Sequence, residues 1–381
     1  MAGRVLAAVR TVLHCRALPA DSRRMKRVLF LVNGLGLGNS TRCHAIMQKL
    51  AEAEVRSSVA TSGNGLWYFR QQKDIDEPVE LGALHYGTSD GHISGMRTIL
   101  SVPEYLGTLR ANARVIDEVM ETLKPDAVVT DSTYLRRRGR VRDVPLFAVN
   151  NADVVHTLYQ AYSDRPSSIR LQFHAVEEMD FLYHRLVPDV ALSPCLAEPP
   201  KASPAPYYRV GPIVRPACRP AATNGRAHRI LVMLSGSRFG SPVYLQRAPA
   251  GCTVDIVGRS APPTNNVPIG CRYLGRVLNT PELAADADVL VVNGGFSAVS
   301  EAFVMRKPLI VIPLPNHAEQ WVNARTICAI GVGMMAREEE IEDAIDTALA
   351  NLESYRAAYA RLPLAPDGAA QAAERILQAI N

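Results

Sequence analysis

The sequence contains no apolar stretch that approaches the roughly 20 consecutive residues of a membrane-spanning helix. Its seven cysteines are odd in number, lie far apart and include no C-x-x-C pair. This pattern argues against a disulfide framework and against a zinc site, and it is typical of reduced thiols in a cytoplasmic protein. Acidic residues form no cluster of the kind that binds a metal ion. We therefore expect a cytoplasmic protein that uses neither a metal nor a cofactor.

Strong charge of one sign is also lacking, since 42 basic and 37 acidic side chains leave a formal net charge of +5. No run of aromatic residues interleaves with the arginines, so the sequence does not predict nucleic-acid binding. One dense basic run extends from Arg136 to Arg142. It fits attraction to an anionic acceptor or to a lipid surface, which would be a peripheral membrane contact, and it fits a solvated loop equally well.

The chain does have enough apolar sequence for two cores. Apolar residues make up 48% of its 381 residues, and a chain of this length forms about two domains. Residues 25–195 and 227–381 each alternate short apolar strands with helical segments, which predicts a parallel sheet in each. Residues 196–226 are rich in proline and predict a linker. Residues 1–24 are arginine-rich and nearly free of acids, and we expect a disordered extension there, with a targeting peptide as the alternative.

Short runs rich in β-branched residues mark the predicted strands. Those of the first domain are 27–33, 57–61, 79–84, 126–130, 146–150 and 190–192, and those of the second are 229–234, 253–258, 271–275, 288–292 and 309–313. A long amphipathic helix is predicted at 98–123. The polar, aromatic and histidine-bearing segment 151–184 is assigned no element.

Two of these strands lead into glycine-rich turns that are followed by helices, 34–38 in the first domain and Asn293-Gly294-Gly295 in the second. Glycine lets the backbone approach a ligand closely, and a helix N-terminus attracts an anion. We expect the second turn to bind a phosphate. A dinucleotide fold is disfavoured, because the first loop lacks G-x-G-x-x-G spacing and the strand 57–61 ends without an acid for a ribose.

The motifs around these turns resemble those of GT-B glycosyltransferases in order and spacing. They are Gly36-x-Gly38-x-x-x-Arg42, Ser235-Gly236-Ser237, Gly294-Gly295-x-Ser297-x-x-x-Glu301, Lys307-Pro308, Ile312-Pro313 and Glu319-Gln320-x-x-Asn323. The chain is similar in pattern to the UDP-glycosyltransferases and to the peptidoglycan N-acetylglucosaminyltransferase, over nearly its whole length after Met25. The resemblance implies two Rossmann-like parallel-sheet domains that face each other across a cleft, with the acceptor on the first domain and the donor on the second.

The resemblance also implies roles for individual residues. Gly294, Gly295 and Ser297 would lie against the donor phosphates, Glu301 would bind the ribose hydroxyls, and Glu319 and Gln320 would hold hydroxyls of the transferred sugar. Ser235, Gly236 and Ser237 would contact the diphosphate or the nucleotide. The acceptor side would comprise Gly36, Gly38, Arg42 and His156.

One position departs from the family pattern. The family commonly carries a histidine after the loop glycines, where it takes the proton of the acceptor hydroxyl, and this chain has Asn39 there. Asparagine cannot act as a general base near neutral pH. Three accounts stay open: Asp131, His44 or His156 is the base; Asn39 only positions an acceptor that loses its proton late; or the chain is inactive or altered.

The function that the resemblance implies is an inverting, metal-independent transfer of a sugar. The donor would be a nucleotide-diphosphate sugar, with a UDP-sugar favoured, and the acceptor a small molecule or a lipid-linked molecule that bears a hydroxyl. UDP-sugar hydrolases and epimerases share the architecture and remain an alternative, as does a non-catalytic partner. The sequence specifies neither the acceptor, the sugar, the nucleotide base nor the oligomeric state.

Overall fold

The structure is a computed structural model that describes residues 24–83, 88–89, 92–93, 102–135, 137, 139–220, 228–234, 245–259 and 267–381. Residues 1–23 of the predicted extension, the motif Ser235-Gly236-Ser237, and Arg136 and Arg138 of the basic run lie outside these ranges. None of the helices within them combines the length and the apolar character that crossing a membrane requires.

The first sheet has seven parallel strands in the order β3-β2-β1-β6-β7-β8-β9. They are β1 (Arg27–Val32), β2 (Arg56–Thr61), β3 (Val79–Glu80), β6 (Ala127–Asp131), β7 (Leu146–Val149), β8 (Val190–Pro194) and β9 (Tyr207–Val210). Strand β6 is buried along its whole length. Such continuous burial is expected of a parallel strand that is covered on both faces, and it explains why the apolar runs in the sequence do not alternate with polar residues.

The second sheet has six parallel strands in the order β12-β11-β10-β13-β14-β15. They are β10 (His228–Met233), β11 (Cys252–Val257), β12 (Cys271–Gly275), β13 (Val289–Asn293), β14 (Leu309–Ile312) and β15 (Gly333–Met335). The helices of this half are α9 (Thr280–Asp286), α10 (Phe296–Val304), α11 (Ala318–Ile330), α12 (Ile341–Ala350) and α13 (Leu352–Arg361). Two parallel-sheet domains confirm the predicted fold class.

Helices cover both faces of the first sheet. On one face lie α2 (Leu37–Glu52), α3 (Gly63–Phe69) and α14 (Gly368–Ile380), and on the other lies α5 (Val102–Leu123). A short antiparallel pair, β4 (Thr88–Ser89) and β5 (His92–Ile93), precedes α5. The predicted helix 98–123 is therefore present as α5 within the described residues.

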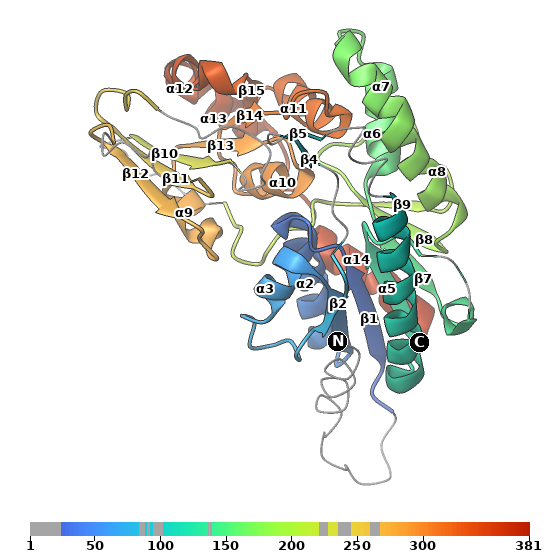
Figure 1. The fold of residues 1–381 in the computed structure, drawn as a ribbon. Helices are drawn as coiled ribbons and strands as arrows, with labels where there is room; N and C mark the ends of the chain where they lie inside the picture. Colours follow the sequence, from blue (N-terminus) through green and yellow to red (C-terminus); the bar gives the residue numbers. More distant parts are fainter. Residues whose placement is uncertain are drawn as a thin grey trace.

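The C-terminal helix α14 packs on the first domain, although the sequence places its residues in the second (Figure 1). Ala372 and Ile376 are buried in the same core as β1 and α2. Lys26 Nζ donates a hydrogen bond to the backbone oxygen of Ile380 at 2.5 Å. An amphipathic helix buries its apolar face against whichever complementary surface is open, and local sequence does not record which surface that is.

Further elements differ from the sequence prediction, among them β15, which no predicted strand covers. Strand β9 lies inside the segment predicted as a linker, where it pairs with β8 and extends the first sheet. The unassigned segment 151–184 contains α6 (Ala152–Ala161) and most of a continuous helix from Arg170 to Leu186. This helix consists of α7 (Arg170–Gln172), a π-helical turn at Phe173–Glu177, and α8 (Glu178–Leu186). Short π-helical turns of this kind occur often at functional sites.

The two domains are joined by a shared apolar cluster as well as by the chain. Tyr159 and Phe173 of the first domain pack with Trp321 and Val322 of α11 in one buried cluster. Figure 1 shows α6 beside α11 at this contact. Across the other side of the interface, the Arg276 guanidinium lies 3.8 Å from the centroid of the Trp67 ring. The structure therefore brings α3 and α6 of the first domain close to the second.

Candidate functional site

The candidate site lies where the strand order of each sheet reverses. Strand β1 pairs with β2 on one side and β6 on the other, and β10 pairs likewise with β11 and β13. In open α/β sheets, ligands bind outside the carboxyl ends of the strands at such points. The β1–α2 turn and the β13–α10 turn both lie there, and they carry the two glycine motifs.

The first turns of α2 and α10 are in direct contact. A Cβ placed on Gly38 would lie 2.8 Å from Ser297 Oγ, so the backbone of one helix start lies against a side chain of the other. The N-cap residues are Gly36 and Gly295, and neither helix has a side-chain cap. Backbone N–H groups at both helix starts are therefore available to a ligand. Two adjacent helix N-termini favour an anion.

A third helix start, that of α11, is fixed beside α10. A Cβ on Gly294 would lie 2.5 Å from the backbone oxygen of Gln320, and Asn323 Nδ2 donates to the Gly294 carbonyl oxygen at 2.9 Å. Gln320 Oε1 accepts from the backbone N–H of Leu314 at 2.9 Å. The half-buried Glu319 lies in the same first turn. The structure thus brings together five predicted donor residues: Gly294, Gly295, Ser297, Glu319 and Gln320.

Asp131, a candidate base, is held in a buried ion pair with Arg42. Arg42 Nε and Nη2 donate to the two carboxylate oxygens of Asp131, both at 2.5 Å, and Cys43 Sγ lies 3.4 Å from Oδ2. The Asp131 side chain is fully buried and that of Arg42 is 8% exposed. Both oxygens accept hydrogen bonds from a guanidinium that stays protonated. Because the Asp131 side chain is fully buried as well as paired, it acts as a structural partner of Arg42 and presents no surface to a substrate.

Asn39 lies in the first turn of α2, next to the contact between α2 and α10. Its amide nitrogen donates to the backbone oxygen of Asn33 at 3.4 Å, a long hydrogen bond, and the side chain is half-buried. Asn39 therefore lies at the candidate site, but it cannot act as the general base, since an amide does not accept a proton near neutral pH.

The two histidines proposed as bases have partners elsewhere in the first domain. His44 is buried, with Nδ1 3.0 Å from the Tyr68 hydroxyl and Nε2 2.9 Å from Asp74. His156 stacks on Phe181, with ring centroids 4.3 Å apart, and burial lowers the pKa of its imidazole. These contacts account for both side chains as packed residues of the first domain.

Glu301, predicted to bind ribose hydroxyls, forms a partly buried ion pair with Arg215. Arg215 Nε and Nη2 donate to its two oxygens, both at 2.7 Å. Arg215 also donates to Thr280 Oγ1 at 2.7 Å and to the backbone oxygen of Leu278 at 3.2 Å. The guanidinium holds the carboxylate in one orientation, with the remaining oxygen lone pairs available for hydroxyl donors. No pattern in the sequence indicates a role for Arg215 at this site.

Glu177 is a second residue that the sequence analysis missed. It lies at the end of the π-helical turn and its side chain is almost fully buried. Gln172 Nε2 donates to Glu177 Oε1 at 2.7 Å, and Gln172 Oε1 accepts from the backbone N–H of Ala318 at 2.8 Å. One glutamine side chain therefore joins Glu177 to the start of α11. Glu177 Oε2 has no hydrogen-bond partner among the residues that the structure describes.

The electrostatics around Glu177 favour its protonated form. Burial and, after it, the nearby Glu319 carboxylate raise the pKa of Glu177 to about 7. Burial also raises the pKa of Glu319, an effect that Arg42 opposes. Burial lowers the pKa of His317, whose Nδ1 is buried without a hydrogen-bond partner in the described part of the chain. Ionisable groups with shifted pKa values in one cleft mark a candidate functional site.

A metal ion has no evident ligand set in the described residues, where no group of three or more His, Cys, Asp or Glu side chains is placed to hold one. The positive charge near the site comes instead from helix N-termini and from Arg42 and Arg215, each of which already has a carboxylate partner.

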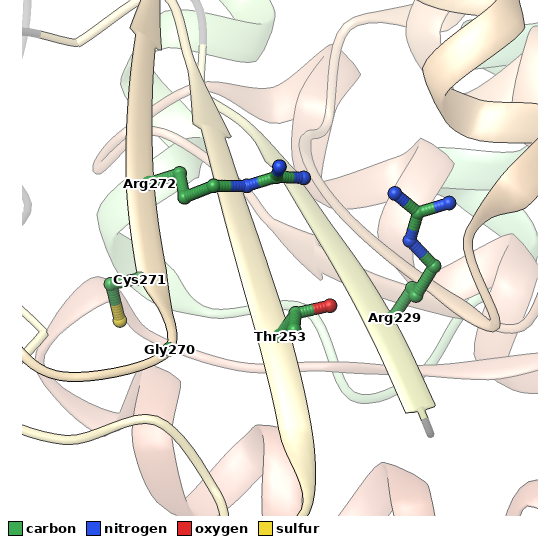
Figure 2. A pocket seen from close by; sticks show the side chains of 5 residues that line it. All are labelled: Arg229, Thr253, Gly270, Cys271 and Arg272. Atoms are coloured by element: carbon green, nitrogen blue, oxygen red, sulfur yellow. The ribbon is translucent and has the colours of Figure 1, made fainter. Parts of the chain in front are cut away.

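A separate pocket of 450 Å³ lies on the second domain (Figure 2). It is lined by Arg229, Thr253, Gly270, Cys271 and Arg272, at the amino ends of β10, β11 and β12. This is the opposite end of the strands from the glycine turns. Arg272 is paired with Asp255 and Arg229 with Asp286. We assign the functional site to the carboxyl ends, because parallel α/β sheets bind their ligands there.

Comparison with solved structures agrees with the fold. The spinosyn rhamnosyltransferase SpnG is 17% identical with a TM-score of 0.58, covering 93% of this chain and 99% of that one. Acinetobacter baumannii MurG is 15% identical with a TM-score of 0.56, covering 93% and 99%. SnogD from Streptomyces nogalater is 15% identical with a TM-score of 0.55, covering 94% and 100%.

Comparison with curated sequences finds archaeal glycosyltransferases. An uncharacterized glycosyltransferase of Methanosarcina mazei is 22% identical over 343 residues, covering 81% of this chain and 85% of the relative. One of Methanopyrus kandleri is 36% identical over 70 residues, covering 18% of this chain and only a fifth of the relative's own length. The model of the family "Glycosyl transferase family 1" matches residues 26–353, most of the chain. The chain therefore belongs to glycosyl transferase family 1, and it is a glycosyltransferase of GT-B fold.

Proposed function

We propose that this glycosyltransferase moves a sugar from a nucleotide-diphosphate donor, with a UDP-sugar favoured, to a hydroxyl-bearing acceptor, with inversion at the anomeric carbon and without a metal ion. The observation that carries the proposal is the contact of two uncapped helix starts, α2 and α10, at Gly38 and Ser297. The leaving diphosphate gains negative charge as the sugar departs. Backbone N–H groups that are already oriented stabilise that charge without reorganising.

The donor would lie on the second domain. Its phosphates would contact Gly294, Gly295 and Ser297, its ribose hydroxyls would contact the Glu301 carboxylate that Arg215 orients, and the transferred sugar would contact Glu319 and Gln320. The motif Ser235-Gly236-Ser237 would contact the nucleotide. The solved structures of SpnG and SsfS6 include complexes with thymidine diphosphate, which supports a nucleoside diphosphate as the ligand of this fold.

Donor binding is tested directly by thermal unfolding with UDP-, TDP- and GDP-sugars, because a ligand that binds only the folded state raises its stability. A UDP-sugar is expected to raise the melting temperature most. If no nucleotide sugar changes it, the donor site is wrong. With a donor identified, free sugar released in the absence of any acceptor would indicate a hydrolase, and the anomeric configuration of a transfer product tests inversion.

A negative charge at the α10 start is expected to weaken donor binding. Ser297→Asp places a carboxylate beside the expected phosphates, and we expect the donor affinity to fall at least about tenfold, since like charges repel where the helix dipole otherwise attracts an anion. Titration calorimetry measures the change. The matched control is Asn351→Asp, which adds an acid at the exposed N-cap of α13. Equal affinities for Ser297→Asp and the control would contradict the placement of the phosphates.

The acceptor side carries an exposed apolar face that supports a membrane contact. In the helix from Arg170 to Leu186, five of the exposed side chains are large and apolar, namely Leu171, Val176, Met179, Leu182 and Leu186. Arg170 and Arg185 are exposed on the same helix, and none of its fully exposed positions is acidic. Apolar side chains flanked by arginines favour an anionic membrane interface. We propose that this face binds the membrane surface at which a lipid-linked acceptor is met.

Vesicle sedimentation tests the membrane contact. We expect the wild-type protein to bind vesicles of phosphatidylcholine and phosphatidylserine more tightly than vesicles of phosphatidylcholine alone. The triple change Leu171→Ser, Met179→Ser and Leu186→Ser is expected to weaken binding at least about tenfold, because three apolar side chains no longer enter the interface. The control changes Ile269→Ser and Leu364→Ser, which are exposed on other segments. Absence of binding, or an equal loss in both variants, would contradict the proposal.

A further inference from the structure

The site needs a group that takes the proton of the acceptor hydroxyl, and the residues expected to do so are otherwise engaged. Asp131 is fully buried with both oxygens bound by Arg42, and His44 has a partner on each ring nitrogen. His156 stacks on Phe181, and its Nε2 lies 3.1 Å from the Gln160 side-chain nitrogen. Asn39 is an amide. A base for this reaction must therefore come from another element of the cleft.

Glu177 lies where the two domains meet, next to the start of α11. It comes from the first domain, on which the acceptor is expected, and Gln172 ties it to the start of α11 in the second. The start of α11 is fixed beside Gly294 through Gln320 and Asn323. The path from Glu177 to the α10 start thus consists of direct contacts.

The two oxygens of Glu177 differ in a way that suits proton transfer. Oε1 accepts a hydrogen bond of 2.7 Å from Gln172, which fixes the carboxylate in place. Oε2 accepts none from any residue that the structure describes, so it is free to accept a proton. The π-helical turn that ends at Glu177 adds a residue to the helix and so changes the direction in which this side chain leaves it.

We propose that Glu177 is the general base of the reaction, an inference that rests on the proposed transfer to a hydroxyl acceptor. The acceptor O–H bond breaks, and its proton bonds to Oε2 of Glu177. The acceptor oxygen forms a bond to the anomeric carbon while the bond from that carbon to the diphosphate oxygen breaks. The electron pair of the broken bond remains on the diphosphate, beside the N–H groups of α2 and α10.

The charged and titratable groups around Glu177 support this role. Glu319 faces it from α11, His317 from the residue before α11, and Asp180 from the following turn of its own helix. The carboxylates raise the pKa of Glu177 and the histidine opposes them, and burial is the largest effect. The resulting pKa of about 7 matches what general-base catalysis at neutral pH favours.

Glu177→Gln tests the proposal. The amide keeps the shape and the contact with Gln172 but cannot accept the proton, so kcat is expected to fall by about 10²–10⁴-fold with little change in the KM for the donor. Glu178→Gln is the matched control, since it removes the adjacent carboxylate, which is half-buried and bound to His174. Glu177→Asp is expected to restore part of the activity.

The pH dependence of kcat distinguishes a base from a structural residue. In the wild type, kcat is expected to rise with pH as Glu177 loses its proton, and Glu177→Gln is expected to lose this acid limb. The acid limb surviving in Glu177→Gln, or disappearing instead in Glu319→Gln, would overturn the proposal. Thermal shifts with the donor distinguish a failure of the Glu177 proposal from a failure of the proposed function. If Glu177→Gln loses activity but still binds the donor, the result supports a role of Glu177 in the reaction. If the wild type does not bind the donor, the proposed function itself is refuted.

A folding measurement gives a readout that is independent of activity. The native Glu177 carboxyl keeps its proton to a higher pH than the unfolded one, from the ordinary 4.5 to about 7. The wild type therefore loses stability relative to Glu177→Gln as the pH rises through this window, and the difference is constant above it. A stability difference that does not change with pH would show that Glu177 does not titrate as proposed.

Discussion

Replacing Arg42 by methionine is expected to lower the free energy of unfolding by about 3–5 kcal/mol, because it leaves the buried Asp131 carboxylate without its partner. The Asp131 side chain is fully buried and both of its oxygens depend on the guanidinium. Denaturant titration measures the change through its midpoint. The effect is large because a buried unpaired charge costs more than the ion pair itself contributes.

The control for this prediction is a second bidentate arginine–aspartate ion pair in the same domain. Arg137 donates to both oxygens of Asp189 at 2.5 and 2.9 Å, but these side chains are 31% and 43% exposed. Arg137→Met is expected to cost less than about 1 kcal/mol, because water replaces the lost partner. If Arg42→Met costs no more than Arg137→Met, then burial does not decide the energetics of the Arg42–Asp131 pair, and the case against Asp131 as a base weakens.

Alanine substitutions at the adjacent glycines Gly294 and Gly295 are expected to have different effects on stability and on donor binding. Gly294→Ala places a Cβ 2.5 Å from the backbone oxygen of Gln320 and 2.7 Å from its Cβ. Neither atom can rotate away, so we expect the starts of α10 and α11 to move apart at a cost of about 1–3 kcal/mol. Chemical unfolding measures this loss, and the donor affinity is expected to fall with it.

Gly295→Ala is the matched partner of that change. Gly295 has φ −64° and ψ 132°, which any residue adopts, and no atom lies within 4 Å of the added Cβ. We expect a stability within about 0.5 kcal/mol of the wild type. The methyl group enters open space at the turn where we propose that the diphosphate binds, so donor affinity is expected to fall about tenfold or more. Normal donor binding by Gly295→Ala would contradict the phosphate site, and equal unfolding of both variants would contradict the packing argument.

Sequence patterns predicted the parts of the fold that depend on neighbouring residues. The apolar runs of β1, β6, β13 and β14 are long, rich in β-branched residues and bounded by polar or glycine residues, so their burial in parallel sheets could be inferred directly. The two glycine turns were found for the same reason. Segment 151–184 was left unassigned because its polar residues obscure a helical period, and its aromatic side chains Tyr159 and Phe173 are buried by a contact with α11 that local sequence does not record.

The site was predicted in part. Gly294, Gly295, Ser297, Glu319 and Gln320 form one neighbourhood because the turn and the start of α11 follow adjacent strands of one sheet. The sequence patterns indicated Arg42 as an acceptor-side residue and Asp131 as a candidate base, but they did not indicate that the two form an ion pair. They are separated by 89 residues, and the separation between Arg215 and Glu301 is 86. No local pattern records such a pairing.

The sequence by itself determined most of the strands, the glycine turns, the two-domain class and the absence of a histidine at Asn39, because each follows from residues a few positions apart. Only the tertiary structure decided which charges are neutralised and which remain reactive. It paired Asp131 with Arg42 and Glu301 with Arg215, placed α14 on the first domain, and buried Glu177 beside Glu319. The physical reason is that burial and electrostatic interaction depend on distance in space, which the fold sets and local sequence does not.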